Sequence, residues 1–107
     1  MKIITPNPTK KKHLEEIKDK MKELGSPTIR MVDRDKYLVA IEGSHRLNAA
    51  KDLDIPIKVK LVDPESFTQN HDFDDLPNKI RIGKLAQNVE LSPQSYINIS
   101  DNKLSFI

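Results

Sequence analysis

The sequence contains no cysteine at any of its 107 positions. Disulfides, thiolate metal sites and cysteine nucleophiles are therefore excluded. Long apolar runs are missing too, since no stretch approaches the roughly 20 apolar residues that cross a bilayer. The opening segment MKIITPNP also lacks the apolar core of a signal peptide. From these absences we expect a soluble, cytoplasmic protein that has no membrane partner.

An excess of charge of one sign is also absent. Eighteen basic and sixteen acidic residues leave a net charge of only +2, and aromatic side chains make up 5% of the chain. Neither value favours nucleic acid as a partner. The run Lys10 to Lys12 is open to two interpretations, a solvated loop or a contact with nucleic acid. With this length and no internal repeat, residues 1–107 are expected to form a single domain.

The sequence does contain alternating helical and extended patterns. Residues 9–25 carry apolar side chains at helical spacing, with Thr9 as the expected N-cap and Gly25 as the stop. TIRMVD and KYLVAIE predict a hairpin, HRLNAAKDLD predicts a second helix capped by Ser44, and IPIKVKLVD predicts a strand. The order predicts an α/β (α+β) fold in which a small mixed sheet carries two main helices.

Residues 64–107 are less regular. We expect a loop or a short helix over residues 64–77, and then a strand in KIRIGKL. SYINIS and KLSFI flank Asp101 and Asn102, a pair typical of two-residue hairpin turns. The chain is therefore expected to end in a β-hairpin.

The most unusual stretch is the corner EGSHR, Glu42 to Arg46, where an apolar strand ends and a helix begins. The start of a helix has unpaired backbone N–H groups and the positive end of the helix dipole, which together attract phosphate. Gly43 tolerates positive φ and lets a ligand approach the backbone, while Ser44, His45 and Arg46 offer hydrogen-bond donors. Glu42 is a candidate ligand for Mg²⁺. The corner therefore predicts a polyphosphate site.

A second interpretation of the corner needs no ligand. Capping alone explains a glycine and a serine at a helix start, and Arg46 could pair with Glu42 or with an aspartate of residues 72–75. Two basic residues in the first turn oppose the helix dipole, however, and that mismatch favours a bound anion. His13 and His71 lack neighbours at metal-binding spacing and are expected to be exposed polar residues.

Residues 3–63 resemble the N-terminal domain of the ParB and sulfiredoxin superfamily. PNP near the start, a helix ending in KMKELG, a hairpin and EGSHRLNAAKDLDIPIKVKLVD follow the order usual in that superfamily. Its members commonly have an NPxxPR-like box, a helix ending in glycine, and a DGxHRxxAAxxLG box before a strand containing VPV. The residues on this last box are Gly43, His45, Arg46, Ala49, Ala50 and Leu53, with Glu42 in place of the frequent aspartate. The resemblance implies a small mixed α/β domain that binds a nucleoside triphosphate at the GSHR turn, often with magnesium.

Two differences between this sequence and the superfamily pattern exclude particular branches of the superfamily. Sulfiredoxins have a catalytic cysteine where this chain has Ser44, so their redox chemistry is excluded. Chromosome-partition proteins continue into a helix-turn-helix domain, for which residues 64–107 show no adequate helical pattern. The first box keeps Asn7 but has Lys11 and Lys12 where its Pro-Arg pair would stand. We expect phosphate contacts from Asn7, Lys11 and Lys12 on the strength of the resemblance.

Sequence and resemblance together predict an ATP- or CTP-dependent NTPase, or a small phosphotransferase similar to the free-serine kinase branch. Gly43 and Ser44 would bind phosphate together with His45 and Arg46, which would also act with Glu42 as catalytic residues. Glu42 would hold the Mg²⁺ that accompanies ATP or CTP.

Two alternatives of other classes stay open. One is a DNA-binding or nuclease-type module, suggested by annotations common in the superfamily and by the lysine run. The other is an interaction protein that keeps the fold and has lost the chemistry. If the chain is an enzyme, Glu15 or Glu16 of the first helix is a candidate base.

Overall fold

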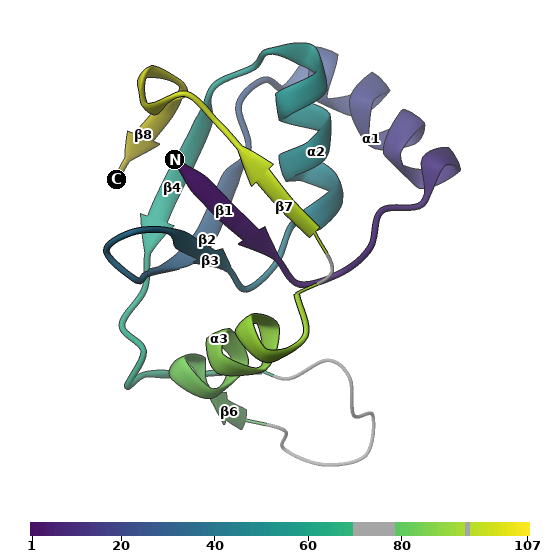
Figure 1. The fold of residues 1–107 in the computed structure, drawn as a ribbon. Coiled ribbons are helices and arrows are strands. Elements are labelled where there is room, and N and C mark those ends of the chain that lie inside the picture. Colours follow the sequence, from purple (N-terminus) through teal and green to yellow (C-terminus); the bar gives the residue numbers. More distant parts are fainter. Residues whose placement is uncertain (70–78, 94) are drawn as a thin grey trace.

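The extended segments of the chain build one mixed sheet of six strands, which is shown in Figure 1 with its helices. The computed structural model describes residues 1–69, 79–93 and 95–107. The strand order is β7-β1-β3-β2-β4-β8, and β5 and β6 pair separately as an antiparallel ribbon. In chain order the elements are β1 (Lys2–Thr5), α1 (Lys11–Leu24), β2 (Thr28–Asp33), β3 (Leu38–Ala40), α2 (Ser44–Leu53), β4 (Ile57–Leu61), β5 (Phe67–Gln69), β6 (Lys79–Arg81), α3 (Ile82–Leu91), β7 (Ser95–Asn98), η1 (Asp101–Lys103) and β8 (Leu104–Phe106).

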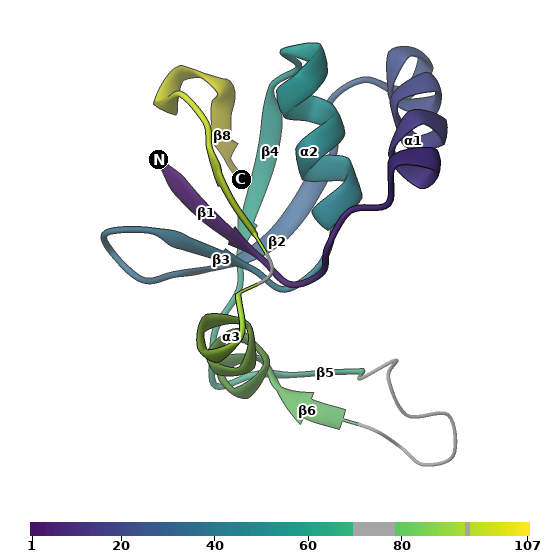
Figure 2. The same ribbon diagram turned by 45° about the vertical axis from the view of Figure 1, so that its right-hand side comes forward.

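Side chains of the sheet alternate between two hydrophobic cores, because successive residues of a strand face opposite sides. Ile3 and Leu38 belong to the larger core, which includes α2, and their neighbours Ile4 and Val39 belong to the smaller core beneath α3. Helices therefore cover both faces, and α1 packs against the outside of α2 (Figure 2). The mixed α/β architecture expected from the sequence is confirmed.

The first half of the chain follows the sequence patterns closely. β2 and β3 form the expected antiparallel hairpin, in which Val32 lies opposite Val39. Gly25 ends α1 with φ of 80°, as the sequence indicated. The expected N-cap is wrong, because Lys10 rather than Thr9 precedes α1 and makes no side-chain cap.

The third helix, α3, is an addition to the two that the sequence predicted. The strand expected in KIRIGKL is limited to β6, and the chain turns helical at Ile82. Ile82, Ala86 and Val89 are buried on one side of α3, at a helical spacing that stabilises it against the sheet. Ile80 and Ile82 alternate with charged residues, a pattern typical of strands, and the sequence therefore predicted a strand over the same stretch.

The C-terminal strands form, but the hairpin expected between them is wrong. β7 pairs antiparallel with β1, where Ile97 lies opposite Ile3, and β8 pairs parallel with β4. They are the two edges of the sheet. Six strands laid flat would place these edges about 24 Å apart, whereas the chain from Asn98 to Leu104 reaches about 20 Å at most. The sheet therefore curls, which Figure 2 shows.

The segment expected as a loop or short helix contains a strand. Residues 67–69 form β5, which pairs with β6 in the small ribbon beside α3 (Figure 2). Residues 70–78, which include His71 and the aspartates of residues 72–75, lie outside the described residues. Among the helices that the structure describes, none combines the length and apolar character needed to traverse a bilayer.

Candidate functional site

The corner between β3 and α2 depends on glycine. Gly43 is the N-cap of α2 and has φ of 78° and ψ of 29°, in the left-handed region. A Cβ atom at this position would lie 2.6 Å from Ile29 Cδ1 and 3.3 Å from Arg46 Nη2. Gly43 therefore brings the start of α2 against β2 and leaves room for the Arg46 guanidinium.

Ser44 connects this corner to the loop after β1. The serine is buried, and its Oγ accepts a hydrogen bond of 3.0 Å from the backbone N–H of Asn7. The expected capping role is wrong, because the N-cap is Gly43 and Ser44 is the first residue of the helix. The hydroxyl instead stabilises the position of the PNP loop beside α2.

His45 links the beginnings of the two neighbouring helices. Its Nε2 accepts a hydrogen bond of 3.1 Å from the backbone N–H of Lys10, and its ring packs edge-on against His13 with 4.3 Å between centroids. Burial, and then the charges of His13 and Lys10, lower the pKa of His45 below its usual value. Because Nε2 is an acceptor here, the neutral ring has its proton on Nδ1.

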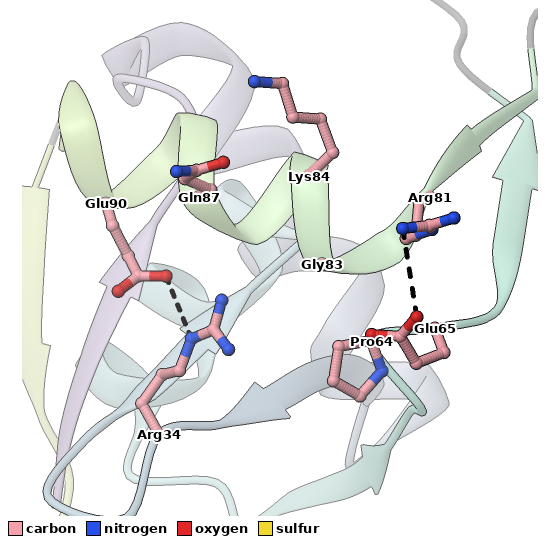
Figure 3. Close-up of a pocket in the computed structure, with 8 residues that line it drawn as sticks. All are labelled: Arg34, Pro64, Glu65, Arg81, Gly83, Lys84, Gln87 and Glu90. Carbon is pink, nitrogen blue, oxygen red and sulfur yellow. Dashed lines mark hydrogen bonds and ion pairs between the residues drawn. The ribbon is translucent and has the colours of Figure 1, made fainter.

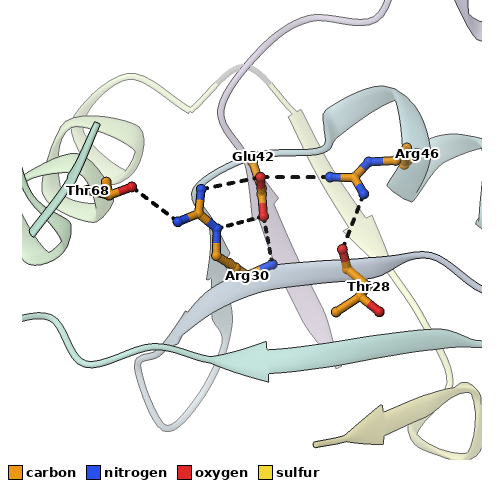
Figure 4. Close-up of polar contacts among 5 residues, drawn as sticks. All are labelled: Thr28, Arg30, Glu42, Arg46 and Thr68. Atoms are coloured by element: carbon orange, nitrogen blue, oxygen red, sulfur yellow. Dashed lines mark hydrogen bonds and ion pairs between the residues drawn. The ribbon is translucent and has the colours of Figure 1, made fainter. Parts of the chain in front are cut away.

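Glu42 lies at the centre of a polar cluster that also contains two arginines (Figure 4). Arg30 Nε is 2.9 Å from Glu42 Oε2 and its Nη2 is 3.4 Å from Oε1, while Arg46 Nη2 is 3.8 Å from Oε1. Arg30 also donates to Thr68 Oγ1 at 3.1 Å, and Arg46 donates to the Thr28 carbonyl at 3.2 Å. The cluster thereby joins the start of α2 to β2 and to β5.

Glu42 stays ionised over a wide pH range. Burial alone would raise the pKa of Glu42, but the hydrogen bonds and charge of Arg30, together with the charge of Arg46, outweigh it and hold this pKa below its usual value. The sequence left open whether Arg46 pairs with Glu42, and the structure places the two side chains in contact.

A magnesium ion at Glu42 would have to displace arginine. Magnesium in proteins is commonly held by one or two carboxylates together with waters and substrate phosphates, but both carboxylate oxygens of Glu42 face Arg30, Oε2 at 2.9 Å and Oε1 at 3.4 Å. The described residues contain no group of three or more His, Asp or Glu side chains arranged to hold a metal. A metal role for Glu42 stays a prediction that its contacts do not favour.

The corner and the start of α1 line a common groove of about 540 Å³. Its volume lies within the roughly 300–1,000 Å³ range of ligand pockets. The lining residues come from the PNP loop, one side of α1 and the start of α2: Asn7, Pro8, Lys10, His13, Ile17, Glu42, Gly43, Ser44, His45 and Arg46. Both helices begin here without an acidic residue in their first turn, so two positive dipole ends and several basic side chains share the groove.

Most of the residues singled out from the sequence meet in this groove. Asn7 and the whole run Glu42 to Arg46 line it, whereas Lys11 and Lys12 are exposed on the first turn of α1 and do not. Glu15 and Glu16, the candidate bases, do not line it either.

Sequence reasoning missed Lys10 and His13 as members of the site. They lie three residues apart, and Ile17 follows four residues later, so all three share one side of α1. Their helical spacing could be read from the sequence. It pointed to the site only once the structure placed the start of α1, at Lys11, beside the start of α2.

A second groove, of about 590 Å³, lies beneath α3 near the β2–β3 turn (Figure 3). Four of its five charged lining residues form pairs: Arg34 Nε lies 3.0 Å from Glu90 Oε1, and Arg81 Nη1 lies 3.9 Å from Glu65 Oε2. Glu90 also accepts a hydrogen bond of 2.7 Å from the Tyr37 hydroxyl. Arg34 and Tyr37 hold α3 beside the β2–β3 hairpin, and the Arg81–Glu65 pair links β6 to the segment after β4, so a structural role accounts for these four charges.

Comparison of the chain with family models, with curated proteins and with solved structures gave no match. The interpretation of the groove therefore rests on its own residues.

Proposed function

We propose that the groove between α1 and α2 binds the phosphates of a nucleoside triphosphate such as ATP or CTP. The observation that carries this proposal is the meeting of two helix starts. Lys10 and Gly43 are the N-caps of α1 and α2, both line the groove, and neither helix has an acid in its first turn or a side-chain cap. A bound polyphosphate would satisfy both positive ends at once.

Each group of the groove has a role in this proposal. The backbone N–H groups at the start of α2 donate to phosphate oxygens, which Gly43 makes accessible because it has no Cβ. Arg46 keeps further N–H donors beyond the one given to Thr28, and a guanidinium matches two phosphate oxygens at once. Lys10 adds positive charge, and the neutral His45 ring, which accepts from the Lys10 backbone, holds the start of α1 beside the start of α2.

The same groups would serve an NTPase or a phosphotransferase. Phosphoryl transfer depends mainly on positioning and on charge stabilisation around the phosphates, which His45 and Arg46 would supply. Glu42 would act as a positioning residue for Arg46, because Arg30 and Arg46 already occupy its carboxylate oxygens. The DNA-binding alternative rests on the superfamily resemblance and on the lysine run, of which Lys11 and Lys12 lie outside the groove.

Isothermal titration of ATP and CTP, with and without Mg²⁺, tests the proposal. Replacing Arg46 by Ala removes a charge-assisted hydrogen bond and should weaken binding by about 1.5–3 kcal/mol. The empty variant should remain folded, since the Arg46 side chain is 39% exposed and its pair with Glu42 is long.

Arg81→Ala is the matched control, because it removes the same charge from β6, outside the groove. Its affinity for nucleotide should stay near that of the wild type. Absence of binding in the wild type, or equal losses in both variants, would contradict the proposal.

A further inference from the structure

The groove is adjacent to a smaller, apolar hollow at the other end of α1. Ile17, Met21, Leu24 and Pro27 supply its apolar lining, and its polar lining comes from Lys20, Gly25, Ser26 and Arg46. Two of these residues, Ile17 and Arg46, also line the groove. The groove and the hollow therefore border on the same two side chains.

The size of the hollow suits part of a ligand. Its volume of about 200 Å³ lies below the roughly 300–1,000 Å³ that pockets for whole ligands have. Its character also differs from that of the groove, because no acidic residue lines it and side chains of Ile, Met, Leu and Pro dominate. It fits a flat, weakly polar group attached to an anion.

One side of α1 connects the two regions. Lys10, His13 and Ile17 lie along the groove, and Ile17, Met21 and Leu24 continue along the hollow at the same helical spacing. From Lys10 to Leu24 the helix rises about 21 Å. This side of α1 thus changes from basic at the start of the helix to apolar at its end.

Leu24 does not owe its position to the core. Its side chain is 82% exposed, although the neighbouring Met21 is only 5% exposed. Leu24 therefore stands at the rim of the hollow with most of its side chain free to contact a group bound there.

We propose that this hollow binds the base of the nucleotide whose phosphates occupy the groove. The inference rests on the proposed function, since it takes its ligand from there. Apolar contacts with Met21, Leu24 and Pro27 would hold either face of a purine or pyrimidine. Such contacts discriminate weakly among bases, so we expect ATP, GTP and CTP to bind with affinities within about tenfold of one another.

Methionine-methyl NMR gives a direct readout, because the chain contains only three methionines. In protein labelled at the methionine methyl groups, ATP should shift the Met21 signal, while inorganic triphosphate should leave it nearly unchanged. Met31, which is fully buried in the core, and Met1, at the start of the chain, are internal controls that should not follow the base.

Titration of the same two ligands provides the second readout. Wild-type protein should bind ATP at least about tenfold more tightly than inorganic triphosphate, as expected when the apolar surface of the base is buried. Leu24→Gln should reduce that ratio several-fold and leave the affinity for triphosphate intact. Leu91→Gln is the matched control, because Leu91 is likewise exposed, at 73%, and lies on α3.

The outcomes separate the two proposals. Equal affinities for ATP and triphosphate, with no shift at Met21, would overturn the base site and leave phosphate binding in the groove standing. If neither ligand bound, the proposed function would fall and the base site with it. If ATP shifted the Met21 signal but Leu24→Gln left the ratio of ATP to triphosphate affinities unchanged, the assignment would also be contradicted.

Discussion

At the residue scale, each side chain at the start of α2 has a structural contact that the sequence did not reveal. Ser44 accepts from the Asn7 backbone, His45 accepts from the Lys10 backbone, and Arg46 donates to the Thr28 carbonyl. The sequence predicted these residues as neighbours because they are consecutive. It could not predict their partners, which come from the β1–α1 connection and from β2 and meet only in the folded chain.

The lowered pKa of His45 makes a prediction about stability and pH. Unfolded His45 takes up a proton near pH 6.5, whereas the folded protein does so only at lower pH. Between these values the unfolded chain binds more protons, so the free energy of unfolding falls as the pH falls. His45→Gln should therefore show a flatter loss of stability below pH 6.5 than the wild type, measured by urea denaturation at pH 7.5 and at lower pH.

Carboxylates also make the free energy of unfolding depend on pH, in both proteins. The contribution of His45 is therefore the difference between the curves of the variant and the wild type. An NMR titration of the wild-type imidazoles gives an independent check, in which His45 should titrate below the ordinary histidine value. Parallel stability curves for the two proteins would show that His45 carries no such linkage.

At the element scale, the angle between β3 and α2 depends on one backbone conformation, that of Gly43. Gly43→Ala should destabilise the protein, because a non-glycine residue at positive φ costs about 1–2 kcal/mol and the new Cβ would collide with Ile29 at 2.6 Å. The Ile29 side chain is fully buried and has little room to move. Thermal or chemical denaturation measures the loss.

Gly43→Ala in an Ile29→Val background is the control for this substitution. Valine lacks the Cδ1 atom that would lie 2.6 Å from the new Cβ, while the positive φ of Gly43 is the same in both backgrounds. Gly43→Ala should therefore destabilise the Ile29→Val protein by less than it destabilises the wild type. Equal losses in the two backgrounds would mean that the contact with Ile29 carries no cost.

The elements that the sequence predicted well are those with a single consistent pattern. α1, the β2–β3 hairpin and β4 each have one period, and Gly25 gave a clear stop. α3 was missed because Ile80 and Ile82 alternate with charged residues as in a strand, while Gly83 in the first turn weakened the helical pattern. A glycine suits that position, since a Cβ would lie 3.0 Å from the Pro64 carbonyl oxygen.

At the scale of the whole molecule, the sheet brings distant parts of the chain together. β7 joins β1 at one edge and β8 joins β4 at the other, pairings that no local pattern specifies. The sequence predicted both C-terminal strands but assigned them to each other, because a two-residue turn signal stood between them. β7 is held in place by Ile97, which is buried in the larger core, and β8 by Leu104, which packs against the same core.

Two neighbouring residues of β7 test this arrangement. Ile97 is 3% exposed and belongs to the larger core, whereas Tyr96 is 54% exposed on the opposite face. Ile97→Ala should lower the free energy of unfolding by about 2–5 kcal/mol, a large share of the roughly 5–15 kcal/mol typical of whole domains. Tyr96→Ala should lower it by much less. Similar small losses in both variants would place β7 outside the core.

The position of β1 between β3 and β7 has a consequence for synthesis of the chain. At about 5–20 residues per second, roughly 5–20 s separate the addition of Thr5 from that of Asn98. During this time one side of β1 has no partner strand, and an unpaired edge invites association with other nascent chains. β1 is only four residues long, and Pro6 follows it directly. The brevity of the strand and the proline after it limit how far a foreign strand can pair before β7 emerges from the ribosome.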